Sequence, residues 1–523
     1  MRAIDYFDKG AEAFPDRIAI NDRTTQYSYR QMQEASYKIA RAMWARGLLG
    51  EERAAIFSPN DARILLCMLG MMRAGSVWVP VNHRNALDAN LQFLNYSGTS
   101  WLFYHSSFRD QVREMKAQVP SLKHFICLDG ENDGDPSLDA FIEQGIEGGE
   151  QADWGDPRGN LDRLVGLVPT GGTTGPAKGV MVTGLSWGTM VETANLCLRC
   201  EDLPPVCLST APLSHAAGVV AFAMFAMSAT NVVMPAFDAL EVLQNIERYR
   251  VTHIFLPPTA LYSMLAHPKV SEFDYSSLRR MLLAAAPVSP DKLKKAVEVF
   301  GPCVCQSYGQ TECPMYMTYL DTKTVAAAAA GDHPERLRSC GKATPAVRLA
   351  IMDDGGNLLP PHETGEIVSR GALVTGGYYN LSEATAEIRT FGWHHTGDVG
   401  YRDEDGFFYI VDRKKDMIIT GGFNVYCAEV ESCVMELHEV RDCAVIGVPD
   451  EKWGEMVKAV VALREGESLT EEAVIAHCKS RLGSVKSPKS VEFWQEIPKT
   501  PAAKTDKKTI RSRYWAKADR AVH

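Results

Sequence analysis

The sequence has no excess of positive charge. Its 55 Lys and Arg residues are outnumbered by 65 Asp and Glu residues, which gives a formal net charge of −10. The chain therefore offers no overall basic field for nucleic acid or an anionic membrane, although a local basic groove for an anionic substrate stays compatible with this balance. With 46% hydrophobic and 23% charged residues over 523 positions, the composition is globular and excludes a mainly disordered or fibrous protein.

The sequence also lacks a regular cysteine framework. Its 13 cysteines are scattered, and the closest pairs are Cys197 with Cys200 and Cys303 with Cys305. A zinc site would need two such pairs with matching polar ligands, so we interpret these thiols as small buried hydrophobes. The first residues contain no apolar leader, so we expect no signal peptide, reduced thiols and a cytoplasmic location.

The sequence also has few apolar runs that could cross a membrane. The segment Ala216–Phe237 carries no charge and is about as long as a bilayer span of roughly 20 residues. It contains Ser228, Thr230, Asn231 and Pro235, and many of its other residues are small. This pattern favours a buried helix that runs into a strand, so we expect no integral membrane span.

Alternating helix and strand patterns in the first third of the chain predict an α/β fold. Apolar residues at helical spacing predict helices over Tyr29–Arg46 and Asp61–Ala74. Strands at Arg53–Phe57 and Ser76–Pro80 flank the second helix, which implies a right-handed crossover and a parallel sheet. The middle third repeats the pattern, with helices predicted over Ala239–Tyr249 and Pro290–Val299 and strands over His253–Leu256, Arg280–Leu283 and Val304–Ser307.

The sequence pattern changes in the last third of the chain. Short strands punctuated by Gly over Val347–Ile410 predict a small β subdomain. The charged stretch Asp412–Asp416 marks a boundary, after which about one hundred residues read as a compact α+β domain. The fold class is therefore α/β, with a large N-terminal domain of mixed sheets sandwiched by helices and a smaller C-terminal domain. We expect the polar tail Pro498–Lys508 to be exposed and mobile.

A glycine-rich loop, Thr170–Gly179, carries the clearest chemical signal. It follows the strand-like segment Leu164–Val168, and its glycines allow close approach of the backbone to a ligand. Successive N–H groups with hydroxyls and Lys178 suit phosphate oxygens, although a glycine-rich turn with an exposed lysine explains the loop equally well. It is not a Walker loop, because Lys178 is preceded by Ala177 and lacks a following Ser or Thr.

Further short motifs follow in order along the chain, and each has an ordinary structural interpretation when taken alone. An aromatic-Gly-x-Thr-Glu segment can be a strand end with a polar turn, and Asp398 can be a turn acid. His394 and His395 are adjacent in a predicted strand, so they point to opposite faces and are not a metal-binding pair. The motifs are Gln306–Glu312, His395–Asp398, Asp412–Asp416, Gly421–Glu429 and Pro498–Lys504.

Taken together, the loop and these motifs resemble the adenylate-forming superfamily of acyl-CoA synthetases, adenylation domains and beetle luciferases. The resemblance runs from about residue 10 to residue 515. Departures from the usual residues are Gly171 for Ser, Ala177 for Pro, Cys427 for Pro and Ala503 for Gly. The Gly171 exchange removes a hydroxyl that would face phosphate, and Ala503 slightly stiffens the loop that carries Lys504.

The resemblance implies an ATP site. Tyr308 would stack on adenine, Asp398 would bind both ribose hydroxyls with support from Arg413, and Glu312 with Thr173 would hold Mg²⁺. The remaining residues that the resemblance places against the nucleotide are Thr170, Gly172, Thr174, Gly175, Lys178, Ala286, Gln306, Gly309 and Thr311.

The resemblance also implies a mobile C-terminal lid. The large domain would span residues 1–412, the hinge 413–416 and the lid 417–523, with Lys415 as the pivot. Gly421 and Gly422 would lie beside the pantetheine arm of coenzyme A. Lys504 would bridge the carboxylate and the α-phosphate, and His215 would lie near the carboxylate, which makes both residues candidates for catalysis.

The implied activity is an AMP-forming carboxylic acid:CoA ligase that works through an acyl-adenylate, with ATP, Mg²⁺ and coenzyme A. An amino-acid substrate is disfavoured, because amino-acid-activating relatives place an Asp at the position of His215. A hydrophobic acid (medium- or long-chain fatty, aryl or alicyclic) is favoured by small and apolar residues, which equally fit helix packing. These residues are Ala216, Ala217, Ala284, Ala285, Ala286, Met224, Phe225 and Met315.

Other functions stay open at this point. An acyl-AMP ligase that loads a carrier protein and a luciferase-like oxygenase use the same scaffold, while a P-loop-like ATPase or a non-catalytic nucleotide-binding protein belongs to another class. The absence of the Walker spacing disfavours the ATPase, and Lys504 with Glu312 disfavours an inactive binder. We expect no nucleic-acid partner. The sequence does not decide which acid is the substrate or which thiol accepts the acyl group. It also leaves the oligomeric state open, and a homodimer is one possibility.

Overall fold

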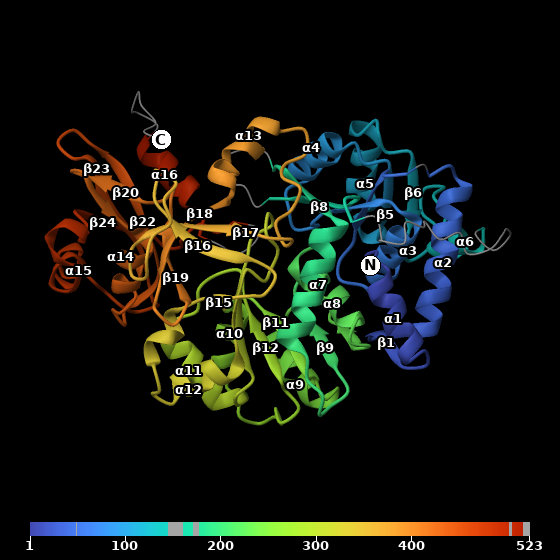
Figure 1. Cartoon of the computed structure of the whole chain (residues 1–523), viewed down its shortest axis with the longest axis horizontal. Coiled ribbons are helices and arrows are strands. Elements are labelled where there is room, and N and C mark those ends of the chain that lie inside the picture. The colour runs from blue at the N-terminus through green and yellow to red at the C-terminus, as the bar shows by residue number, and fades with distance from the viewer. Residues whose placement is uncertain (49, 145–160, 171–176, 501–504, 516–523) are drawn as a thin grey trace. The chain divides into compact units, whose positions relative to one another are not determined.

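The chain folds as two compact units in the computed structural model, which describes residues 1–48, 50–144, 161–170, 177–500 and 505–515 (Figure 1). Unit 1 comprises residues 1–170, 176–349 and 369–392, and unit 2 comprises residues 171–175, 350–368 and 393–523. Helices and strands alternate through unit 1, and the fold is α/β, as the sequence pattern predicts.

One sheet of unit 1 has six strands in the order β6-β5-β3-β4-β7-β8. Neighbours from β6 to β7 run parallel, and β8 is antiparallel to β7. The crossover expected between the first two strands is present, because helix α3 (Ala62–Ala74) connects β3 to its parallel neighbour β4. The strands are β3 (Arg53–Phe57), β4 (Val77–Pro80), β5 (Trp101–Tyr104), β6 (His124–Cys127), β7 (Leu164–Pro169) and β8 (Gly179–Thr183).

A second series of strands in unit 1 runs in the order β15-β14-β13-β12-β11-β9-β10-β1-β2. The strands from β13 to β1 are parallel to their neighbours, and β14, β15 and β2 are antiparallel additions at the two ends. They are β1 (Ile18–Asp22), β2 (Gln26–Ser28), β9 (Val206–Ser209), β10 (Thr230–Val233), β11 (His253–Leu256), β12 (Arg280–Leu283), β13 (Val304–Tyr308), β14 (Thr318–Leu320) and β15 (Gly341–Ala343).

Two helices of unit 1, α2 and α3, have local signals at their ends. Ser28 and Gln31 form a capping box at the start of α2, and Asp61 caps α3, which stops at Gly75 in the left-handed region. The other helices are α1 (Asp5–Ala13), α2 (Tyr29–Ala45), α4 (Leu87–Ser97), η1 (Ser106–Phe108), α5 (Arg109–Gln118), α6 (Leu138–Glu143), α7 (Gly184–Leu198), α8 (Ala216–Phe225), α9 (Ala239–Arg248), α10 (Pro258–Leu265), α11 (Pro290–Phe300), α12 (Thr322–Ala329), η2 (Pro334–Arg338), α13 (Ser382–Glu387) and η3 (Thr390–Gly392).

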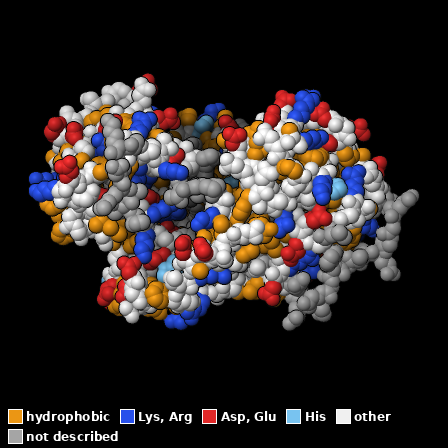
Figure 2. Space-filling view, turned by 90° about the horizontal axis from the view of Figure 1, so that it is seen from above, with side chains coloured by type: hydrophobic (Ala, Val, Ile, Leu, Met, Phe, Trp, Pro, Cys, Tyr) orange, Lys and Arg blue, Asp and Glu red, His pale blue; other side chains and the backbone are white. Residues whose placement is uncertain are grey.

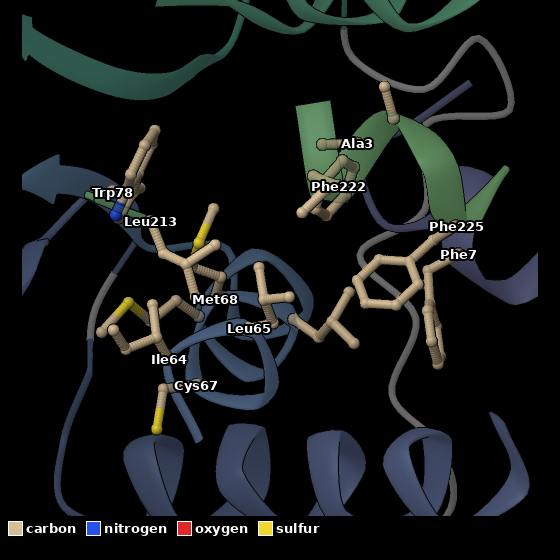
Figure 3. Close-up of a cluster of buried hydrophobic side chains, with 14 of the residues drawn as sticks. Ala3, Phe7, Ile64, Leu65, Cys67, Met68, Trp78, Leu213, Phe222 and Phe225 are labelled. Atoms are coloured by element: carbon tan, nitrogen blue, oxygen red, sulfur yellow. The ribbon is translucent and has the colours of Figure 1, made fainter. Parts of the chain in front are cut away.

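The uncharged segment after residue 215 forms helix α8 and then strand β10. Phe222 and Phe225 of α8 lie against Phe7 of α1 and the apolar face of α3 (Figure 3), and the rings of Phe7 and Phe225 meet edge to face at 5.3 Å. Among the described residues, no helix combines the length and the apolarity needed to cross a bilayer. The prediction of a buried helix that runs into a strand is confirmed.

Unit 2 contains the short strands predicted after residue 347 and a separate C-terminal sheet. Strands β16 (Arg348–Met352), β17 (Gly365–Arg370), β18 (His394–Arg402) and β19 (Phe407–Arg413) are neighbours in that order. The second sheet has the order β21-β20-β23-β22, and β24 pairs with β23 (Figure 1). Its elements are β20 (Ile418–Thr420), β21 (Phe423–Val425), α14 (Cys427–Val434), β22 (Val440–Asp450), β23 (Gly454–Leu463), α15 (Glu471–Lys486), β24 (Ser490–Phe493) and α16 (Lys507–Trp515).

The last residues of the polar tail lead into a helix that the sequence analysis did not predict. Asp506 accepts a hydrogen bond from the Thr509 N–H at 3.0 Å and so caps α16, which already begins at Lys507. The Asp506 N–H in turn donates to the carbonyl of Pro498 at 2.8 Å. Composition alone missed the start of α16, because a capping residue rather than apolar periodicity sets it.

Charges of both signs are interspersed on the face shown in Figure 2. Exposed basic and acidic side chains commonly pair, as in Arg113 with Asp133 at 2.8 Å and Arg279 with Asp202 at 2.6 Å. This distribution agrees with the absence of an overall basic field.

The variant Gly218→Ala tests how closely α8 packs against the preceding turn. A Cβ at this position would lie 1.9 Å from the backbone oxygen of Leu213, so Gly218→Ala must displace the main chain at the start of the helix. We expect a loss of about 1–3 kcal/mol in the free energy of unfolding, measured as a lower midpoint in urea.

The matched control is Gly166→Ala in β7, where the nearest atom would be 3.5 Å away, an ordinary contact. A Gly218→Ala protein that unfolds at the same urea concentration as the Gly166→Ala protein would contradict the close approach of α8 to the preceding turn.

Candidate active site

Three chain segments that carry candidate residues leave the same edge of the second strand series. Strands β9, β11, β12 and β13 are parallel neighbours, so their carboxyl ends lie together. Ala284–Ala286 follow β12, Gly309–Glu312 follow β13, and His215 lies six residues beyond the end of β9. In open α/β sheets ligands bind at this edge, which makes it the candidate site of unit 1.

Tyr378 contacts both Glu312 and Lys178. The Tyr378 hydroxyl donates to Glu312 Oε1 at 2.6 Å, and Lys178 Nζ lies 4.8 Å from the centre of the Tyr378 ring. The Glu312 backbone oxygen accepts from both the N–H and the hydroxyl of Thr375, at 3.0 and 2.9 Å. The loop that ends at Lys178 is therefore brought to the motif that ends at Glu312.

Tyr378 is a site residue that the sequence analysis missed. It is 66 positions from Glu312 in the chain, and its backbone bridges to Val180 of β8. Burial and the adjacent Glu312 carboxylate raise the pKa of Tyr378 well above its usual value, so its hydroxyl stays a hydrogen-bond donor. No motif or spacing in the sequence signals this contact, because only the fold creates it.

The backbone around Tyr308 is tightly constrained. A Cβ on Gly309 would lie 2.5 Å from the Met315 nitrogen, so only glycine fits here. Met315 and Ala285 adopt positive φ values of 61° and 76°, which is unusual for residues other than glycine. Such strain concentrates at functional sites, where the surroundings hold it in place.

Gln306, Thr311 and Thr170 occupy defined places around this backbone. Gln306 lies within β13, paired with Leu283 of β12, and is nearly buried. Thr311 is half-buried next to Glu312, and the Thr170 N–H donates to the Lys178 carbonyl at 2.9 Å, closing the base of the glycine-rich loop.

His215 lies at the N-terminal end of α8, and Ala286 follows β12; both are exposed. The Nδ1 atom of His215 is 2.8 Å from the Ser214 carbonyl oxygen. Although solvent reaches the ring, protein packed around it lowers the pKa of His215 below 6.5 by desolvation. The imidazole is therefore mainly neutral at pH 7, with Nδ1 as the donor and Nε2 free to act as an acceptor.

Four residues proposed for the acid pocket belong to the core instead, namely Ala217, Ala284, Met224 and Phe225. Met224 and Phe225 are fully buried, and the Phe225 ring packs against Phe7 and Tyr29. Their assignment to the pocket was wrong, because helical spacing does not reveal which neighbour covers an apolar face. Ala285 and Ala286 are exposed and Ala216 and Met315 are half-buried, so these four remain candidates to line the pocket.

Unit 2 brings Asp398 and Arg413 together. Asp398 is buried within β18 rather than in a turn, and it is the register partner of Arg413 in β19. The Arg413 Nε atom lies 3.2 Å from Asp398 Oδ1. A carboxylate oriented by a guanidinium can accept two neighbouring hydroxyl groups, as ribose recognition requires.

Glu366 supports the turn before Asp398. It accepts a bond from the Gly397 N–H at 2.9 Å and lies 3.1 Å from His395 and 3.2 Å from Lys414. Burial raises the pKa of Glu366, but these three partners outweigh it and hold the pKa below its usual value. His394 is buried while His395 faces Glu366, so the predicted separation of the two imidazoles onto opposite faces is confirmed.

The candidate hinge and the glycines after it also lie in unit 2. Lys415 is exposed, and its surroundings lower its pKa by desolvation. Gly421 and Gly422 connect β20 to β21 with φ values of 58° and 82°, the two positive angles that a tight two-residue hairpin of type I′ needs. A Cβ on Gly421 would lie 2.5 Å from the Trp453 ring, so this glycine is sterically required.

Several predicted site residues lie outside the described residues: Gly172, Thr173, Thr174, Gly175 and Lys504. Their roles stay predictions. For Mg²⁺, the donor chemistry of Glu312 fits, because a carboxylate oxygen is the ligand that this hard cation takes from protein beside substrate phosphates.

One group of residues that could hold a metal ion occurs in the described part of the chain, at Cys433, Glu436 and His477. Internal partners account for it. His477 Nε2 lies 3.1 Å from the Cys433 carbonyl oxygen and 3.4 Å from Glu436, and the Arg481 guanidinium is 3.5 Å from the same carboxylate. A fixed positive charge on the carboxylate opposes a metal ion there.

Comparisons with known proteins agree with this arrangement. The sequence profile of AMP-binding enzymes matches residues 7–379, and that of the AMP-binding enzyme C-terminal domain matches residues 429–504. The chain is 43% identical to the medium/long-chain-fatty-acid–CoA ligase FadD8 of Mycobacterium tuberculosis, over 89% of this chain and 82% of that protein. It is 34% identical to a feruloyl-CoA synthase of Amycolatopsis sp, over 96% and 97%.

A solved structure extends the similarity to three dimensions. ATP-bound MatB from Rhodopseudomonas palustris superposes with a TM-score of 0.85 at 27% identity, covering 98% of this chain and 99% of that one. The chain therefore belongs to the AMP-binding enzymes, the adenylate-forming superfamily that its motifs resemble. Within this family it is an acyl-CoA synthetase, an AMP-forming acid–thiol ligase. ATP and coenzyme A use fits ligases of this kind.

The environment of His215 predicts how its ring titrates in NMR spectra. Because desolvation lowers its pKa, the His215 ring should titrate below pH 6.5 in histidine ¹³C–¹H NMR spectra, and the buried His253, whose pKa is lowered to about 4, should titrate lower still.

His215→Gln and His253→Gln variants assign the two signals. A His215 midpoint at or above 6.5 would show that the ring is fully hydrated and would remove the argument for a neutral imidazole at pH 7.

Proposed function

We propose that this acyl-CoA synthetase activates a hydrophobic carboxylic acid of the medium- or long-chain fatty, aryl or alicyclic class. Ala216 is next to His215 in the chain, Ala285 and Ala286 follow β12 and Met315 follows β13, and small or apolar side chains at these positions favour a hydrophobic acid. No acidic residue stands at position 215, where an ammonium group of an amino acid would need one. The named relatives act on a fatty acid in one case and form feruloyl-CoA in the other.

The first step is proposed to form an acyl-adenylate and release pyrophosphate. Tyr308 stacks on adenine, and Asp398 with Arg413 binds the ribose. Mg²⁺ at Glu312, with Thr173 as a second ligand, would neutralise phosphate charge, and Tyr378 orients the Glu312 carboxylate through the 2.6 Å hydrogen bond. That contact is the observation on which this assignment rests most directly.

The other nucleotide contacts follow the same assignment. Lys178 and the hydroxyls and N–H groups of the glycine-rich loop bind phosphate oxygens. Lys504 stabilises the charge that develops between the carboxylate and the α-phosphate, which is positioning and electrostatic catalysis with little acid–base work. The remaining contacts proposed for the nucleotide come from Thr170, Gly172, Thr174, Gly175, Ala286, Gln306, Gly309 and Thr311.

The second step transfers the acyl group to the thiol of coenzyme A and releases AMP. We propose that residues 417–523 rotate about the hinge 413–416, with Lys415 as the pivot, and that Gly421 and Gly422 then line the pantetheine path. The neutral His215 lies beside the carboxylate and favours an uncharged environment for the acyl chain. A cytoplasmic location stays a prediction.

A screen of fatty, aryl and alicyclic acids tests the substrate class. We expect pyrophosphate release that requires both an acid and Mg²⁺, and AMP release that additionally requires coenzyme A.

Release of ADP and phosphate without any acid would point to an ATPase and contradict the proposal. AMP release with a phosphopantetheinylated carrier protein but not with coenzyme A would assign the acceptor to a carrier. Activity with amino acids alone would overturn the hydrophobic acid class.

Lys504→Ala tests the adenylation step. Loss of one preorganised charge should slow acid-dependent ATP–pyrophosphate exchange by about 10²–10³-fold, or about 3–4 kcal/mol. The reaction of coenzyme A with a preformed acyl-adenylate should change less, since Lys504 acts in the first step.

Lys508→Ala is the matched control, because Lys508 is an exposed lysine of the same segment. Undiminished exchange in the Lys504→Ala protein would remove this lysine from the mechanism.

A further inference from the structure

Two basic side chains of α16 reach the hinge region. Lys507 Nζ lies 2.8 Å from Glu431 Oε1 and interacts electrostatically with Asp412, the residue immediately before the hinge. Arg511 Nη1 donates to the Lys415 carbonyl oxygen at 3.3 Å. Because Lys507 and Arg511 are four positions apart, they lie on the same face of the helix.

The contact of Lys507 is part of a buried charge network. The Glu431 carboxylate also accepts from the Val445 N–H at 2.8 Å, which fixes it against β22. Asp412 is buried and accepts from the Arg413 N–H at 2.7 Å. Burial lowers the pKa of Lys507, but the surrounding acidic groups raise it by more, so the ammonium remains charged at neutral pH.

The hinge segment is held at further points of its backbone. The Cys427 thiol donates to the Asp416 carbonyl at 2.8 Å, and the Ala428 N–H lies 3.3 Å from Asp412 Oδ2. Together with the bond from Arg511 to Lys415, these contacts fix the carbonyls of the last two hinge residues. A carbonyl changes direction when the torsions of its residue change, so the Arg511 bond belongs to one hinge setting.

Contacts directly before α16 tie the chain on the two sides of residues 501–504. Lys499 and Thr505 form a backbone bridge, and the Asp506 N–H donates to the Pro498 carbonyl at 2.8 Å. The loop is thus closed at its base directly before Lys507, and a displacement of α16 displaces this base.

We propose that Lys507 and Arg511 are positioning residues that fasten α16, and with it the base of the Lys504 loop, to the hinge. The Arg511 bond holds this arrangement in one setting of the hinge, and because Lys504 precedes α16 by only a few residues, a loosened α16 would slow adenylation. This inference rests on the proposed roles of Lys504 and of the hinge.

Half-reaction kinetics of Arg511→Met provide the first test. We expect adenylation, measured as acid-dependent ATP–pyrophosphate exchange, to fall about fivefold in kcat, the effect of one lost hydrogen bond. The KM for ATP should stay unchanged, and thioester formation from a preformed adenylate should stay within about twofold. Lys507→Met should have a larger effect, and Lys507→Arg should restore most of the rate.

Matched controls come from the same helix. Arg513 lies over the Trp494 ring at 4.1 Å and Lys508 is exposed. Arg513→Met and Lys508→Met should leave both half-reactions unchanged. If Lys507→Met fails to fold, the paired variant Glu431→Gln/Lys507→Met, which removes both charges, replaces it.

Limited trypsin digestion measures how accessible the hinge is, without measuring catalysis. Cleavage after Arg413, Lys414 or Lys415, identified by mass spectrometry, should become several-fold faster in Arg511→Met and Lys507→Met than in the two controls.

The outcomes separate this inference from the proposed function. Equal hinge cleavage in Arg511→Met and Arg513→Met would overturn the fastening, whatever the activity. Faster cleavage with unchanged adenylation would overturn the link to Lys504. A native protein without acid-dependent exchange for any acid would refute the proposed function, while the trypsin comparison would still decide whether α16 fastens the hinge.

Discussion

The parallel alignment of β9, β11, β12 and β13 is the constraint on which the candidate site of unit 1 depends. Because these strands point the same way, the segments that follow them leave from one edge, which gathers residues from separate parts of the chain there. The backbone at this edge is strained at Ala285 and Met315, where the surrounding packing holds positive φ values. Loss of the strand register would disperse the site even if every side chain were retained.

Charge is placed differently in the two units. In unit 1, Tyr378 stands between Glu312 and Lys178, so the carboxylate is oriented by a neutral hydroxyl and stays available to a cation. In unit 2, acids and bases are joined in networks, at Asp398 with Arg413 and at Glu431 with Lys507. The more buried of the two pairs, Glu431 with Lys507, contributes mainly to specific geometry, because desolvation offsets most of its attraction.

Much of the fold could be predicted because local signals agree with the tertiary structure. The capping box at Ser28 and the stop at Gly75 are encoded within a few residues, and strands such as Arg53–Phe57 are found where predicted. The motifs also led to the family. The interpretation of Met224 and Phe225 as pocket residues failed, since a wholly apolar helix gives no sign of which face meets a ligand.

The sequence by itself determined the family, the order of the motifs and the alternation of helices and strands, because these depend on residue type and on short-range spacing. The tertiary structure alone decided that Tyr378 bonds to Glu312, that Asp398 lies in a strand opposite Arg413, and that α16 reaches back to Lys415. Each of these contacts joins residues far apart in the chain or depends on strand register. Such contacts arise only when packing fixes distances that no local propensity encodes.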